Sequence, residues 1–181
     1  MCPSMNMNKN DLDESELSKE WILNLFYSTK GNLNDINRAI DKKLKLRGLR
    51  NITVFEEFIK NRLNTNPLAL KMANMDVSTI EAVYLSQYSQ LNGIEILDLR
   101  KNFIGDEGLG AIAQSSLFSK LRELDLRNNG ISRLGVKILA ESKTLGCLEK
   151  IDLRTNKLGK RWEDKLRETG NFPKLIELKI A

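Results

Sequence analysis

The chain has 181 residues and a formal net charge of +5, with 41% hydrophobic and 29% charged residues, a composition typical of a globular domain and not of a disordered chain. It contains no histidine, which excludes histidine-based triads, histidine metal ligands and histidine pH switches. No apolar run is long enough to span a membrane, and the N-terminus lacks the apolar segment of a secretory signal. With only two cysteines, these features predict a cytoplasmic location.

The first 66 residues show no internal repeat and are expected to form a helical cap over residues 13–66. Apolar residues recur at helical spacing in three segments, which predict helices over residues 14–28, 33–46 and 53–63. Asn32 can cap the second helix, and Thr53 and Glu56 have the spacing of a capping box in the third. Asn66-Pro67 should end that helix. Residues 1–12 are expected to be a disordered tail.

Residues 67–181 contain a repeat of 27 residues. Leu97, Leu124, Ile151 and Leu178 are 27 positions apart, and the segments around them read IEILDLRKNFI, LRELDLRNNGI, LEKIDLRTNKL and LIELKIA. The same step leads back to Leu70, in a degenerate copy. The chain is therefore predicted to hold four to five copies of a unit of the form LxxLxLxxNxL followed by a helix-like stretch.

Each copy predicts a strand followed by a helix. In IEILDLR, Leu97 and Leu99 point to one side of a strand, while Asp98 and Arg100 point to the other. The stretch from Gly108 to Ser116 then changes to helical spacing. Repetition of this unit gives parallel strands with helices on the outer side, and each copy buries its apolar face against its neighbours.

An asparagine column is predicted at the turns after the strands. Asn102, Asn129 and Asn156 share one repeat position, and their side chains can bond the backbone of the adjacent turn. The first copy has Met75 at this position. We therefore expect the first turn to be less regular than the others.

The repeated pattern resembles the leucine-rich repeat family, and the repeat length and the phrase NFIGDEGLGAIAQ resemble its ribonuclease-inhibitor-like subtype. The resemblance covers about residues 68–181. It implies an α/β solenoid, a right-handed horseshoe with its parallel sheet on the concave face, whose open N-terminal end would be covered by the helical cap. It also implies a protein-binding module and not an enzyme, with no cofactor and no catalytic or metal-binding residues.

The polar sides of the strands are the candidate partner-binding surface. Neighbouring strands lie roughly 5 Å apart, so side chains of one repeat position stack into columns. The candidate residues are Asp98, Asp125 and Asp152 in one column, Arg100, Arg127 and Arg154 in the next, and Lys101, Asn128 and Lys150 beside them. Stacked arginines suit an acidic partner, because guanidinium matches carboxylate and phosphate groups. Alternatively, each arginine pairs with a neighbouring aspartate and the face is nearly neutral.

The predicted function is protein–protein interaction on the concave face, in an intracellular adaptor or in a protein delivered into the cytosol of a host cell. One alternative is regulation of a GTPase, because the repeats resemble those of the Ran GTPase-activating protein and an arginine near a phosphate can stabilise transferred charge. Another is homodimer assembly through the open edge of the last strand. No nucleic-acid partner and no membrane insertion are expected, since the basic stretch over residues 38–50 reads as a solvated helix face.

Overall fold

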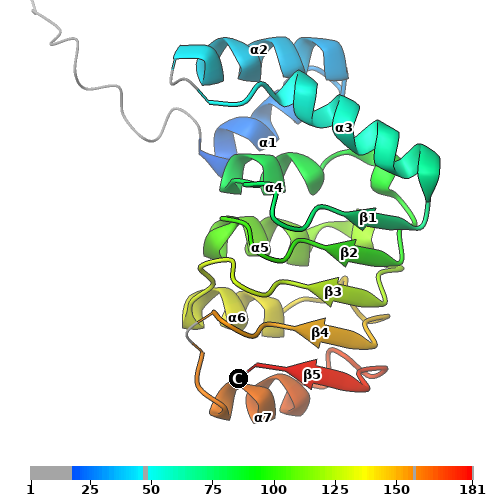
Figure 1. The fold of residues 1–181 in the computed structure, drawn as a ribbon, viewed down its shortest axis with the longest axis vertical. Helices are drawn as coiled ribbons and strands as arrows, with labels where there is room; N and C mark the ends of the chain where they lie inside the picture. The colour runs from blue at the N-terminus through cyan, green and yellow to red at the C-terminus, as the bar shows by residue number, and fades with distance from the viewer. Residues whose placement is uncertain (1–17, 47–48, 157, 181) are drawn as a thin grey trace, which may run out of the picture.

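A computed structural model of the protein describes residues 18–46, 49–156 and 158–180. Five short strands form one parallel sheet in chain order, and helices line one side of it (Figure 1). The strands are β1 (Ala69–Lys71), β2 (Ile96–Asp98), β3 (Glu123–Asp125), β4 (Lys150–Asp152) and β5 (Glu177–Lys179). The predicted α/β class, with parallel strands alternating with helices, is confirmed.

Within the described residues, three α-helices precede the sheet and four alternate with its strands. The first three are α1 (Lys19–Ser28), α2 (Leu33–Leu46) and α3 (Ile52–Thr65). The repeats contain α4 (Thr79–Leu85), α5 (Gly105–Gln114), α6 (Arg133–Ala140) and α7 (Arg161–Glu168), with short 3-10 helices η2 (Ser89–Leu91) and η3 (Ser116–Phe118). The tail expected over residues 1–12, and residues 14–17 of the first predicted helix, lie outside the described residues.

The strand register reproduces the repeat length found in the sequence. Leu70 pairs with Leu97, and the pairing continues through Leu124 and Ile151 to Leu178, always in parallel. These residues are buried, from fully in Leu70 and Leu97 to 5% exposed in Leu178. The degenerate first copy is therefore a full member of the sheet, as its 27-residue spacing predicts.

The N-terminal helices continue the core of the repeats. Ile36 and Ile40 of α2, and Phe55 and Ile59 of α3, are buried in the same apolar cluster as the strand residues. In Figure 1 these helices lie at the β1 end of the sheet, with α3 next to β1. Because burial of the first repeat depends on them, we propose that residues 13–66 act as the cap; this boundary stays a prediction.

The starts of α2 and α3 test the predicted caps. Asn32 caps α2 as predicted, since its Oδ1 accepts from the backbone N–H of Asn34 at 3.1 Å. The capping box in the third helix is wrong: the hydroxyl of Thr53 donates to Asp41, and Asn51 occupies the cap position without a side-chain bond. The carboxylate of Asp41 on α2 accepts from the first amides of α3. Glu56 is therefore free to turn into the core.

The asparagine column is confirmed. The buried side chain of Asn102 donates to the carbonyls of Met72 and Leu99 at 2.9 and 2.7 Å, and its Oδ1 accepts from the N–H groups of Met75 and Val77, both at 3.0 Å. Side-chain amides thus bond backbone groups that the short strands leave without ladder partners.

The irregular turn is not where the sequence predicts it. The N–H of Met75 bonds to Asn102 just as the N–H of Asn129 bonds to Asn156, because this contact needs only a backbone donor. The following turn differs instead: the N–H of Asn102 donates to the Asn128 carbonyl at 3.2 Å. As a result, Oδ1 of Asn129 is buried without a hydrogen-bond partner in the described part of the chain.

Two glycines of α5 are expected to respond with opposite signs to alanine. A Cβ on Gly108 would lie 2.9 Å from the Cβ of Ala82 on α4, so Gly108→Ala should separate the helices and destabilise the chain by about 1–3 kcal/mol. A Cβ on Gly110 would meet the Cγ2 of Ile138 at 3.4 Å, so Gly110→Ala should instead stabilise by up to about 1 kcal/mol through helix propensity. Urea unfolding of both variants measures the difference, and equal effects would contradict the close approach of α4 and α5.

Candidate functional site

The predicted site residues lie on the side of the sheet turned away from the helices, here called the strand face. The aspartates end β2, β3 and β4, and each arginine follows two residues later in the adjoining turn. The backbone N–H of Arg100, Arg127 and Arg154 donates to the aspartate of its own repeat at 3.1–3.2 Å. This bond folds the chain back after each strand, which brings the arginine side chain near that aspartate.

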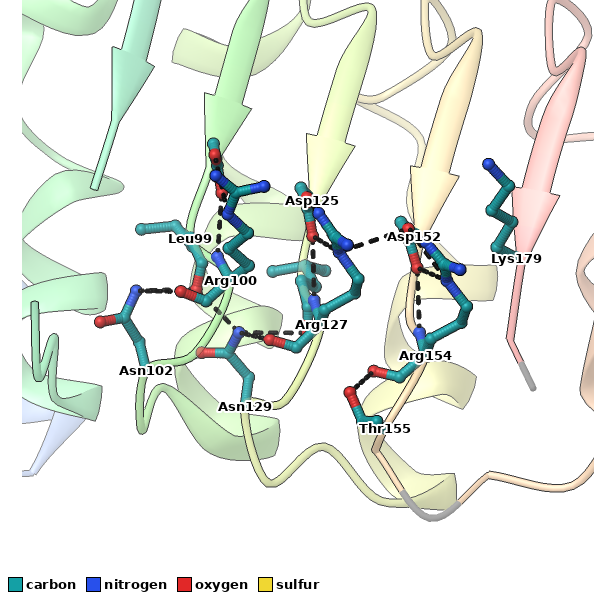
Figure 2. Close-up of polar contacts among 12 residues, drawn as sticks. Leu99, Arg100, Asn102, Asp125, Arg127, Asn129, Asp152, Arg154, Thr155 and Lys179 are labelled. Atoms are coloured by element: carbon teal, nitrogen blue, oxygen red, sulfur yellow. Dashed lines mark hydrogen bonds and ion pairs between the residues drawn. The ribbon is translucent and has the colours of Figure 1, made fainter. Parts of the chain in front are cut away.

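Two of the three arginines are tightly paired. Arg127 holds Asp125 through Nη2 at 2.6 Å and reaches Asp152 at 3.4 Å. Arg154 holds Asp152 through Nη2 at 2.7 Å, and Figure 2 shows these contacts as a chain across neighbouring strands. Arg100 instead has one ion-pair contact, at 3.5 Å, with Asp98. The internal ladder considered in the sequence is therefore present at two positions and weak at the third.

The pKa values of the ladder residues shift in the direction expected for ion pairing. Burial raises the pKa of Asp152, but hydrogen bonds from the Arg154 side chain and backbone, together with the charges of Arg154 and Arg127, lower it below its ordinary value. The hydrogen bond to Asp125 raises the pKa of Arg127, against a smaller opposing effect of desolvation. Both groups are therefore charged throughout the neutral pH range.

The remaining predicted site residues occupy two different environments. Lys150 is paired with Glu123 at 2.7 Å across β3 and β4. Lys101 and Asn128 lie in the turns, with left-handed φ angles of 57° and 52°. Both are exposed, and within the described residues Lys101 forms no ion pair. Lys101 and Asn128 are therefore available to a partner at the edge of the sheet.

The strand face is hollowed in two places with different charge. Over the strands, a hollow of about 340 Å³ is lined by acidic and basic residues alike. Over the turns lies a hollow of about 710 Å³, and the described residues that line it include four cations and no acid: Ala73, Asn74, Arg100, Lys101, Arg127, Asn128, Arg154 and Thr155. The hollow over the turns, here called the cationic hollow, is thus lined by Lys101, Asn128 and all three arginines of the column.

One exposed apolar residue beside this hollow was not singled out from the sequence. Phe103 is 68% exposed, and the hollow that it lines shares Asn128 and Thr155 with the cationic one. Its repeat position holds Asp76 and Gly130 in neighbouring copies. An aromatic residue at a turn position that holds aspartate or glycine in neighbouring copies was the signal that could have identified it.

The described residues contain neither a membrane-spanning helix nor a cluster of metal-ligating side chains. No helix in residues 18–46, 49–156 and 158–180 is both long and apolar enough to cross a membrane. Over the same residues, no three cysteine, aspartate or glutamate side chains are grouped so that they could hold a metal ion.

Comparison with known proteins identifies the repeats. The Leucine Rich repeat family matches residues 94–113 and 119–140, which contain β2 with α5 and β3 with α6. A search of curated proteins finds no match. Leucine-rich repeat domains are generally protein-interaction modules. Residues 94–140 of this chain are therefore leucine-rich repeats, and their 27-residue register extends to β1, β4 and β5.

Proposed function

We propose that this chain is a protein-interaction module of the ribonuclease-inhibitor-like subtype that binds an acidic partner on the strand face, the surface expected to be concave. The observation that carries the proposal is the cationic hollow, whose described lining residues include four cations and no acid. Arginine side chains present planar donors that suit carboxylate and phosphate groups. The 27-residue strand–helix unit supports the proposed subtype.

The proposed setting is a cytoplasmic adaptor, or a protein delivered into the cytosol of a host cell, without catalytic residues of its own. An open surface lined by several repeats suits a protein partner, because each repeat contributes one row of side chains. Regulation of a GTPase stays a prediction from the resemblance to the Ran GTPase-activating protein.

Charge reversal on the strand face should remove partner binding. We expect the combined variant Arg100→Glu, Arg127→Glu and Arg154→Glu to lose proteins that the wild-type chain captures from cell extract, because the cationic hollow becomes anionic. A matched control reverses three exposed cations of α2 in Arg38→Glu, Lys42→Glu and Lys45→Glu, which changes the net charge equally.

Both variants are first checked for folding by thermal denaturation. Loss of partners in the strand-face variant alone supports the proposal. An equal loss in both variants would reduce the effect to net charge, and retention of all partners in the strand-face variant would place the binding surface elsewhere.

A second candidate function is self-assembly through β5. Within the described residues β5 pairs only with β4, and Ile176, directly before β5, is 76% exposed. An unpaired strand edge beside an apolar side chain is a surface on which a second copy can add its own strand. Sedimentation at rising protein concentration tests this proposal, and a monomer at every concentration would reject it.

A further inference from the structure

The three arginines of the column are not equivalent, and this difference locates the part of the strand face that is open to an anion. Arg127 and Arg154 each donate through Nε and Nη2 to an aspartate of their own repeat. Arg100 has no side-chain hydrogen bond among the described residues, and its side chain is 45% exposed, against 39% in Arg154 and 32% in Arg127. Within the described residues, Arg100 therefore keeps all five of its guanidinium N–H groups for an added ligand, whereas Arg127 and Arg154 each have two engaged by an aspartate.

The side-chain charges of the strand-face columns are also unevenly distributed, and the end of the sheet that holds Arg100 is the more positive one. At the β1–β2 end, the columns hold three cations, Lys71, Arg100 and Lys101, and one carboxylate, that of Asp98; the exposed Asp76 lies outside them, at the repeat position of Phe103. Over β3, β4 and β5 the charges balance: the acids are Glu123, Asp125, Asp152 and Glu177, and the bases are Arg127, Lys150, Arg154 and Lys179. The positive surplus of the columns thus lies entirely at the β1–β2 end.

Resting on the proposed function, we propose that Arg100 and Lys101 are the anion-binding residues of the strand face, and that Arg127 and Arg154 mainly hold the turns. The ligand is an oxyanion, carboxylate or phosphate ester, on an acidic segment of a protein partner. An apolar side chain of that segment packs on Phe103, which is 68% exposed beside the same hollow. This end of the strand face therefore suits a short segment that contains both acidic and apolar side chains.

Repulsion explains why the other two arginines contribute less. An anion that approaches Arg127 meets the carboxylates of Asp125 and Asp152, both already within 3.4 Å of the guanidinium. Binding there would break an existing charge-assisted pair or place three anions together, so the gain over water is small. At Arg100 the nearest competing carboxylate makes only one long contact, and the adjoining Lys101 adds a second positive charge.

The test follows each arginine by the NMR signal of its Nε–H group in the full-length chain. The probe is a synthetic peptide that alternates glutamate with leucine; a second carries phosphoserine in place of glutamate, and a third, neutral control carries glutamine. We expect the Arg100 signal to move with an acidic probe while the Arg127 and Arg154 signals stay in place. The arm that binds more tightly identifies the oxyanion as carboxylate or phosphate.

Affinity measurements with matched variants complete the test. Arg100→Gln should weaken binding of the acidic probe about tenfold, the effect of losing one charge-assisted contact, while Arg154→Gln, with the same charge change, should weaken it less than about twofold. Phe103→Ala should weaken the leucine-containing probe more than an alanine-containing one.

Equal losses in the two arginine variants, movement of the Arg127 signal, or no signal movement with either acidic probe would overturn the inference. None of these results affects the proposed function, which fails if the triple strand-face variant keeps all captured partners or if the α2 control variant loses them equally.

Discussion

Replacement of Asn156 by alanine is expected to destabilise the chain by about 3 kcal/mol, because it leaves several buried backbone groups without partners. Oδ1 of Asn156 accepts from the N–H groups of Asn129 and Ile131 at 2.8 and 3.1 Å. Its Nδ2 donates to the carbonyls of Leu126 and Leu153 at 2.8 and 2.9 Å. The side chain is 3% exposed, so water cannot replace these bonds without opening the turn.

Asn129→Ala is the matched control, and its cost should be only about 1 kcal/mol. Oδ1 of Asn129 has no hydrogen-bond partner to lose among the residues that the structure describes. The two main carbonyls that its Nδ2 contacts, those of Leu99 and Leu126, each also accept from another asparagine of the column. Urea unfolding with equal m-values gives both free energies of unfolding. A larger loss in Asn129→Ala than in Asn156→Ala would contradict this account of the second turn.

Glu56→Ala is the second change with a large expected effect, about 3 kcal/mol of destabilisation. Glu56 is 4% exposed where α3 meets α4, and it accepts from the hydroxyls of Tyr84 and Tyr88 at 3.2 and 3.3 Å. Asn37 donates to it as well, and the ammonium of Lys60 lies 2.6 Å away. Truncation leaves the buried hydroxyls of Tyr84 and Tyr88 and the buried amide of Asn37 without this acceptor. Glu57→Ala, at the exposed neighbouring position, should be close to neutral.

The same carboxylate makes stability depend on pH in a defined direction. Burial raises the pKa of Glu56, but the hydrogen bonds from Lys60 and Asn37 and the charge of Lys60 outweigh it and lower the pKa below 4.5. A carboxyl with a lowered folded pKa contributes stability above its unfolded pKa and loses it as pH falls through the folded pKa. The difference in unfolding free energy between the wild-type chain and Glu56→Gln should therefore shrink from about pH 6 to about pH 3. A constant difference would contradict ionisation of Glu56 in the folded state.

The repeat region could be predicted closely because its signal is periodic. The 27-residue step in the sequence is the offset in every strand pair, including that of Leu70 with Leu97. The stacking of Asn102 and its equivalents also follows, since a buried amide at a turn has few other roles. The same spacing places the aspartates and arginines on one face of the sheet.

Contacts between elements could not be read from local patterns. The Thr53 and Glu56 spacing suggested a local cap, yet Asp41 of another helix binds the start of α3. The arginine column looks uniform in sequence, but among the described residues Arg127 forms ion pairs with two aspartates, whereas Arg100 forms one with Asp98 alone. Equivalent side chains can thus adopt different geometries in successive repeats, and periodicity carries no information about this difference.

The register is the same in every strand pair, so the spacing of the side-chain columns favours some partner backbones over others. Side chains of one column advance by about 4.8 Å from strand to strand, in straight rows that cross the sheet at right angles to the strands. One face of an α-helix recurs with each turn, about every 5.4 Å, whereas one side of an extended chain recurs every second residue, about every 6.6 Å. A helix laid across the strands thus stays nearly in phase with successive rows, whereas an extended segment falls out of step after one or two.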